Sequence, residues 1–196
     1  MIGYMKKILA IVILNLCFTN QSIANSIKDF QIEGISILDS LTNFISKEQI
    51  LNKKNNSTDL YKSDDFYSIT FFKNSAFNLK DFDEIQFHLE KNDSLFKIHA
   101  LTGAKHISDK KQCLKEINKT EKDLDVLFKG IIKYGKDNYE HSSKKGYIYK
   151  HIVYEFSNGK ITAKCDKWDK DTGIKDSLVF DIYTKKILNW LNTKAY

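Results

Sequence analysis

The chain contains no proline and no arginine, and it is rich in lysine, asparagine, isoleucine, phenylalanine and tyrosine. Nucleic-acid and phosphate sites favour arginine, because its planar guanidinium group binds two acceptors at once. The lysines are also interleaved with acidic residues, as in residues 119–123, which is typical of a solvated surface. The formal net charge of +6 therefore does not predict a nucleic-acid partner.

The sequence also lacks a recognisable reaction motif. It has no Gly-x-Ser-x-Gly, no His-Glu-x-x-His and no glycine-rich phosphate loop. Paired acids such as Asp64 and Asp65 fall in an expected loop, where they are typical of solvated turns. The sequence therefore predicts no catalytic residue and no cofactor, and an enzyme would have to assemble its site from distant residues.

A long hydrophobic run occurs only near the start of the chain. Lys6 and Lys7 precede an apolar run over residues 8–18, and the small residues Ser22 and Ala24 follow it. This pattern is typical of a cleaved signal peptide. The run is shorter than the roughly 20 residues of a membrane-spanning helix. We therefore expect no transmembrane segment in the mature chain.

We expect cleavage after Ala24, which makes residues 1–24 a signal peptide and residues 25–196 a single domain in the periplasm or outside the cell. Two alternatives stay open. Met5 is a second candidate start beside Met1, and Cys17 would carry the lipid of a lipoprotein, although the large side chain before it fits that signal poorly.

Two cysteines remain after the expected cleavage, Cys113 and Cys165. Cys113 lies on an apolar stripe with spacings of four and three, which predicts a long helix over about residues 109–134. Cys165 lies on the inward face of a predicted strand. Exported proteins meet an oxidising compartment, so we predict a Cys113–Cys165 disulfide between helix and sheet, with two buried free thiols as the alternative.

Hydrophobic periodicity predicts an α+β fold with antiparallel sheet, in the order ααβββ-α-βββ-α. Two short helices are expected within residues 27–53, and a last helix begins at Thr184. Asn158-Gly159 is typical of a type I′ hairpin turn. The expected strands cover residues 67–71, 84–91, 94–101, 147–156, 160–168 and 176–183.

The outer face of the second hairpin is the best candidate surface. If residue 157 pairs with residue 160, Tyr149 lies opposite Trp168 and His151 opposite Asp166. Two large aromatic side chains beside a His–Asp pair are suited to binding a protein or a glycan. The alternative is an aromatic pair and an ion pair that only stabilise the sheet.

Metal sites are weakly indicated. His88 and His99 are expected as diagonal neighbours on the first hairpin, but a metal site needs three or four ligands and no tight spacing supplies them. Residues 166–173 have some features of a calcium loop, with the glycine misplaced and no closing glutamate. We therefore predict no metal.

Residues 30–41, Phe-Gln-Ile-Glu-Gly-Ile-Ser-Ile-Leu-Asp-Ser-Leu, resemble the start of an uncharacterised family of short exported bacterial proteins. In that family an Ile-Glu-Gly-Ile-Ser-Ile-Gly-Asp-Ser-Leu run precedes a Ser-x-Glu-x-Ile helix. Residues 46–50 match the second part, Leu38 stands where the family has glycine, and the segment from Cys165 to Trp168 extends the resemblance. The resemblance implies an export route and a disulfide, and it implies no activity.

The expected element order is also similar to that of small outer-membrane assembly lipoproteins and of the β-lactamase inhibitor protein, which act by binding other proteins. Such a likeness of fold is only an association. Our leading hypothesis is a binding or interaction module that uses a sheet face, with another periplasmic or envelope protein as partner. The alternatives are a hydrolase-like periplasmic enzyme and a structural envelope protein.

Overall fold

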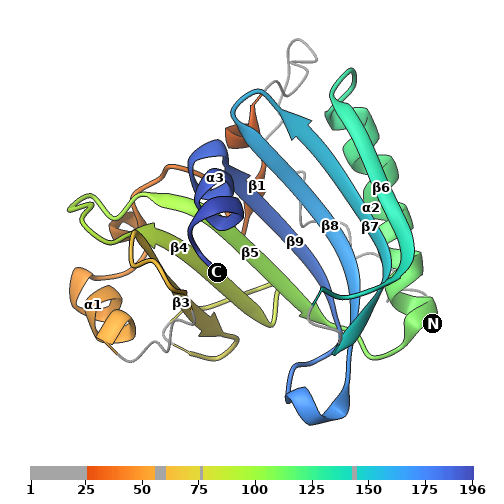
Figure 1. Ribbon diagram of the computed structural model, residues 1–196, viewed down its shortest axis with the longest axis horizontal. Coiled ribbons are helices and arrows are strands. Elements are labelled where there is room, and N and C mark those ends of the chain that lie inside the picture. Colours follow the sequence, from red (N-terminus) through yellow and green to blue (C-terminus); the bar gives the residue numbers. More distant parts are fainter. Residues whose placement is uncertain (1–25, 56–60, 76, 143–144) are drawn as a thin grey trace, which may run out of the picture.

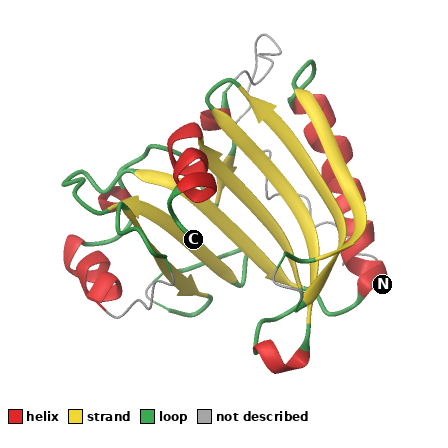
Figure 2. Cartoon of the chain, viewed as in Figure 1, coloured by secondary structure: helices red, strands yellow, loops and turns green. Residues whose placement is uncertain are grey.

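The computed structural model describes residues 26–55, 61–75, 77–142 and 145–196, so the expected signal peptide lies outside the described residues. The chain has the predicted α+β fold. Seven antiparallel strands form one sheet in the order β3-β4-β5-β9-β8-β7-β6, and two strands form a small second sheet. Figure 2 shows the three α-helices around the large sheet. No helix among the described residues is long and apolar enough to cross a membrane.

The expected first helix does not form. Glu33 and Gly34 have φ values of 54° and 77° and join strands β1 (Gln31–Ile32) and β2 (Ile35–Ser36). Two such residues in succession are typical of a type I′ hairpin turn. Leu38 then has a φ of 68°, in the left-handed region, and only a short 3-10 turn follows at Leu41–Asn43. Backbone of this hand interrupts an α-helix.

The second helix forms as predicted. Helix α1 (Lys47–Asn55) begins at a capping box, in which the Gln49 backbone donates to Ser46 Oγ at 3.2 Å and the Ser46 backbone donates to Gln49 Oε1 at 3.0 Å. These bonds satisfy two backbone donors that the first helical turn leaves without partners.

The first three strands of the large sheet form near their predicted places, with one change. They are β3 (Phe66–Phe72), β4 (Glu84–Glu90) and β5 (Ile98–His106). Leu89 pairs with Ile98, and a register shift follows at His99, so the hairpin is looser than predicted and residues 91–97 connect its strands. The first strand, β3, is an edge strand, and α1 packs on it.

The long helix is shorter than predicted, and its expected last turns are a strand. Helix α2 (Lys110–Leu127) ends at Phe128, and Gly130 turns the chain with a φ of 88°. Strand β6 (Ile132–Glu140) follows as the other edge of the sheet. Gly135, which was expected to end the helix, lies in this strand, where a Cβ atom would sit 2.3 Å from the His151 carbonyl oxygen.

The second hairpin pairs β7 (Gly146–Phe156) with β8 (Gly159–Trp168). Its turn is Ser157-Asn158 and not the predicted Asn158-Gly159, because Phe156 pairs with Gly159. The register therefore differs by two positions from the prediction. A shift of two leaves the side chains of residues 150–156 on their predicted face, because side chains alternate along a strand with a period of two. A further shift between Ile148 and Lys150 moves the residues before it off their predicted face.

Strand β9 (Ser177–Thr184) lies between β5 and β8 and leads into helix α3 (Lys185–Thr193). The last helix was predicted to begin at Thr184, and Thr184 is its N-cap, since its side chain accepts a bond from the Ile187 backbone. Helix α2 covers one face of the sheet and α3 the other; in Figure 1, α3 lies in front of the strands.

The main hydrophobic core lies on the α2 face. Ile161, Ala163 and Cys165 of β8 alternate onto this face and are fully or almost fully buried, as are Cys113 and Ile117 of α2. The predicted Cys113–Cys165 disulfide is confirmed, with the two Cα atoms 6.0 Å apart. The bridge fixes the helix on the middle of the sheet.

Candidate functional site

The face of the large sheet opposite α2, which we call the polar face, is the candidate site. Side chains of neighbouring strands line up in rows across it, because paired residues point to the same side. Thr102, Asp181 and Thr162 form one such row over β5, β9 and β8. Val179 and Lys164 belong to the next row, and Ser177 and Asp166 to the one after it. Helix α3 packs around Ala100 and Tyr183, one row before Asp181.

Asp181 is anchored at the centre of the polar face. Its Oδ1 atom accepts a hydrogen bond from Thr102 at 2.7 Å, and its Oδ2 atom accepts one from Thr162 at 3.0 Å. The Asp181 side chain is 3% exposed. Two hydroxyl donors compensate part of the cost of removing this carboxylate from water.

Lys164 links Asp181 to a second buried carboxylate. Its Nζ atom lies 3.4 Å from Asp166 Oδ2 and 3.9 Å from Asp181 Oδ2. Asp166 is 5% exposed, and its Oδ1 atom is buried without a hydrogen-bond partner among the described residues. Burial raises the pKa of Asp166 to about 6 and Asp181 adds to the increase, while Lys164 opposes it. Burial lowers the pKa of Lys164, but the two carboxylates outweigh it and leave that pKa raised.

Tyr139 and His151 border these charges. The Tyr139 hydroxyl lies 2.8 Å from His151 Nδ1, and His151 pairs across the sheet with Lys164. Burial lowers the pKa of His151, and the positive charge of Lys164 lowers it further. The neutral form of His151 is therefore favoured near pH 7. We refer to Tyr139, His151, Lys164, Asp166 and Asp181 together as the charged cluster.

Three of the four predicted site residues lie on the polar face. His151 and Asp166 do so, although they are diagonal neighbours and not directly opposite. Asp166 is buried, so the surface is less exposed than expected. Trp168 pairs with Gly146, and its ring centroid lies 4.3 Å from that of His141.

Tyr149 does not belong to the site, and its predicted pairing with Trp168 is wrong. The register of β7 and β8 shifts between Ile148 and Lys150, which leaves Tyr149 as the extra residue of a β-bulge. Its ring packs against the core, and the Lys110 ammonium lies 4.2 Å from the ring centroid. Both contacts are on the α2 side of the sheet.

Sequence reasoning missed Asp181 and Tyr139. A signal for Asp181 was present, because the apolar residues Leu178, Phe180 and Ile182 alternate with it and place it on the opposite face. Tyr139 could not be found in this way, because its strand was not predicted. Thr162 and Lys164 alternate with the inward residues Ile161, Ala163 and Cys165, so the sequence pattern places them on the polar face, but their link to β9 depends on strand order.

The predicted histidine pair has other contacts. His88 Nε2 lies 2.8 Å from the Tyr61 hydroxyl, and His99 Nδ1 lies 3.4 Å from Thr184 Oγ1. Within the described part of the chain, no three His, Cys, Asp or Glu side chains are grouped so that they could hold a metal ion. The segment that faintly resembled a calcium loop contains a 3-10 turn at Lys170–Thr172.

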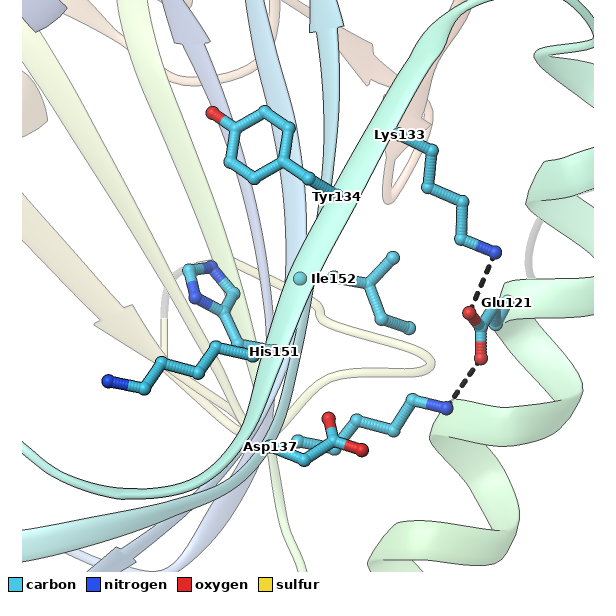
Figure 3. A pocket seen from close by; sticks show the side chains of 9 residues that line it. Glu121, Lys133, Tyr134, Asp137, His151 and Ile152 are labelled. Atoms are coloured by element: carbon cyan, nitrogen blue, oxygen red, sulfur yellow. Dashed lines mark hydrogen bonds and ion pairs between the residues drawn. The ribbon is translucent and has the colours of Figure 1, made fainter.

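A second feature lies at the β6 edge. A hollow of about 480 Å³ follows residues 133–137 of the strand and reaches Glu121 of α2 and residues 150–152 of β7. Figure 3 shows Lys133 and Tyr134 pointing to opposite sides of β6, with Lys133 turned toward Glu121. Lys133 of β6 and Lys150 of β7 form ion pairs with Glu121 at 2.7 and 2.5 Å. These ion pairs connect β6 and β7 to helix α2.

Comparison with known proteins gives no relative: no family model, no curated protein and no solved structure matches the chain.

Proposed function

We propose that the protein is an exported binding module and that its ligand or partner contacts the polar face at the charged cluster. The observation that carries this proposal is the Lys164–Asp166 pair, whose carboxylate is buried and retains an oxygen without a hydrogen-bond partner among the described residues. Burying charges costs free energy, and apolar residues of similar size are often as stable or more so. A binding role gives a reason to keep the charges.

The chemistry of the cluster favours a ligand with hydrogen-bond donors. Asp166 Oδ1 is an acceptor, and Lys164 donates beside it. The indole of Trp168 and the imidazole of His141 add an aromatic pair at the same end of β8. Aromatic and charged side chains in partly desolvated positions contribute most to binding energy in many interfaces.

Export is part of the proposal and has two supports. The first is the signal-peptide pattern in residues 1–24. The second is the disulfide between Cys113 and Cys165, since disulfides persist mainly in oxidising compartments. Together they favour the periplasm or the outside of the cell.

The experiment is photo-crosslinking in the native host, with a photoreactive phenylalanine derivative in place of Trp168. Leu95 is the matched control, because it is 57% exposed and lies in the connection before β5, beyond the opposite end of the cluster. We expect a discrete adduct from position 168 that Asp166→Asn abolishes, and none from position 95. Equal adducts from both positions, or none from position 168, would count against the proposal.

A second candidate is an acid–base enzyme. Asp166, with its pKa raised to about 6, and Asp181, anchored by two threonine hydroxyls, flank one lysine. Two carboxylates in different environments are typical of a proton donor paired with an ionised partner. If the protein is an enzyme, Asp166→Asn should abolish turnover of the ligand that crosslinking identifies, while binding of that ligand persists. If the protein is a binding module, Asp166→Asn should abolish binding.

A further inference from the structure

The two edges of the large sheet differ in how they are protected. At the β3 edge, α1 packs on the strand, and four of its seven residues are buried. At the β6 edge, eight of the nine residues are exposed and Tyr139 is half-buried. An open edge presents backbone N–H and C=O groups to any strand that can approach, so proteins usually shorten or cover it.

Strand β6 is long for an open edge, and it is not wholly polar. Ile132 is 68% exposed and Tyr134 is 50% exposed, and Val126 at the end of α2 is 80% exposed. Lys133 lies between Ile132 and Tyr134, and Lys136 follows two residues after Tyr134 on the same face; both lysines discourage unspecific pairing. A partner strand must therefore match both the apolar and the charged positions.

One of the residues that line the hollow beside β6 has no side chain. Gly135 lies in the middle of residues 133–137, which line it, and Figure 3 shows the side chains of Lys133 and Tyr134 leaving the strand on either side. A partner strand that pairs along β6 would contact only backbone at Gly135 and side chains at the residues on either side of Gly135.

We propose that the partner is a second copy of this chain, and that the two β6 strands pair antiparallel about Gly135. In this register Lys133 lies opposite the partner copy's Asp137, and Tyr134 lies opposite its Lys136. The first pair joins opposite charges on one face, and the second places an ammonium beside an aromatic ring on the other. Each pair occurs twice because the interface is symmetric.

Charge selects this register over its neighbour. Pairing about Lys136 places two lysines opposite each other on the symmetry axis, which is unfavourable. Asn138 has a φ of 54°, which ends the regular extended run after Asp137. The matched segment is therefore Lys133–Asp137, and the dimer joins two seven-stranded sheets into one.

The test is sedimentation velocity of the purified exported protein over a range of concentrations. We expect a monomer–dimer equilibrium that Asp137→Lys shifts to monomer, because that change sets Lys133 against a lysine. Asp123→Lys is the matched control: it makes the same charge change at an exposed position of α2 and should leave the equilibrium unchanged.

A mixing experiment separates a lost contact from a damaged fold. Lys133→Glu should also give monomers, but it removes the ion pairs of Lys133 with Glu121 and Asp125 of its own chain as well. The deciding result is therefore the equimolar mixture with Asp137→Lys, which should associate again, because both interfacial pairs then join opposite charges. Circular dichroism verifies that each variant is folded. A wild-type protein that stays monomeric at every concentration, or an Asp137→Lys variant that dimerises like wild type, overturns the proposal. Neither result tests the charged cluster as a binding site, because the matched segment ends before Tyr139, the member of the charged cluster that lies on β6.

Discussion

The Lys164 ammonium lies 3.4 Å from the Asp166 carboxylate on the face of the sheet that α2 does not cover. The pair lies within a strand whose other face builds the hydrophobic core. Apolar side chains at both positions together would fit that environment at lower electrostatic cost. Our account of function depends on why the pair is there.

The first prediction concerns pH. Because the pKa of Asp166 is raised from 3.8 to about 6, the folded state binds the proton more tightly than the unfolded state does. The stability from this group is complete below pH 3.8 and is lost as pH rises through about 6. At 1.36 kcal/mol per pKa unit, the loss is about 3 kcal/mol.

Urea unfolding of wild type and Asp166→Asn at several pH values measures this effect. The variant cannot titrate at this position, so the difference in unfolding free energy between wild type and variant should fall with pH across that window. A difference that stays constant shows that Asp166 has an ordinary pKa. Lys164 and Asp181 face the same group, and neither is altered in this comparison.

The second prediction concerns the disulfide. Replacing both Cys113 and Cys165 by alanine removes a crosslink with a sequence separation of 52 residues. The chain-entropy model gives a loss of about 4 kcal/mol for a loop of this length. Thermal unfolding of wild type with and without reductant should show the same loss of stability. The melting temperature of the double variant should be the same with and without reductant.

The third prediction concerns Glu33. Its carboxylate accepts hydrogen bonds from the backbone N–H groups of Lys80, Asp81 and Phe82, at 2.8–3.1 Å. Glu33→Ala leaves these donors without that partner, and we expect a loss of about 2 kcal/mol in unfolding free energy. Glu48→Ala, at an exposed position of α1, is the control and should change stability by much less. Similar losses in both variants would contradict this role.

The fourth prediction concerns the backbone of Leu38. Leu38 has a φ of 68°, a conformation that costs a residue with a Cβ atom about 1–2 kcal/mol. Both Leu38→Ala and Leu38→Gly lose the contacts of the side chain with the core. Only glycine removes the cost of the positive φ at this position, so Leu38→Gly should be more stable than Leu38→Ala by about 1 kcal/mol. Chemical denaturation of the two variants measures which one is more stable.

The second hairpin and the disulfide show what local sequence can predict. The alternation of Ile152, Tyr154, Ile161 and Cys165 identified the inward face of the second hairpin, and a register error of two positions did not disturb it. The same reasoning placed both cysteines on the core side and so predicted their bond. Face assignment is robust because it depends on a short period within one strand.

Other features depend on information that lies outside each segment. The apolar spacing of Leu124, Leu127, Ile131 and Tyr134 continues a helical pattern past Gly130, where the chain turns into β6. A glycine is compatible with a helix end or with a strand. Whether the residues after Gly130 form a helix or a strand is determined by the pairing of β6 with β7. The bulge at Tyr149 and the meeting of Asp181 with Lys164 depend in the same way on strand order.

The most direct test of the account is a replacement of the charged pair together with the second carboxylate that Lys164 faces, Lys164→Met with Asp166→Leu and Asp181→Asn, measured both by urea unfolding and by photo-crosslinking from position 168. If the pair is kept for binding, the protein should remain as stable as wild type to within about 1 kcal/mol, or become more stable, and the adduct should disappear. If stability instead falls by several kcal/mol while the adduct persists, the pair is structural and the polar face is not the binding site.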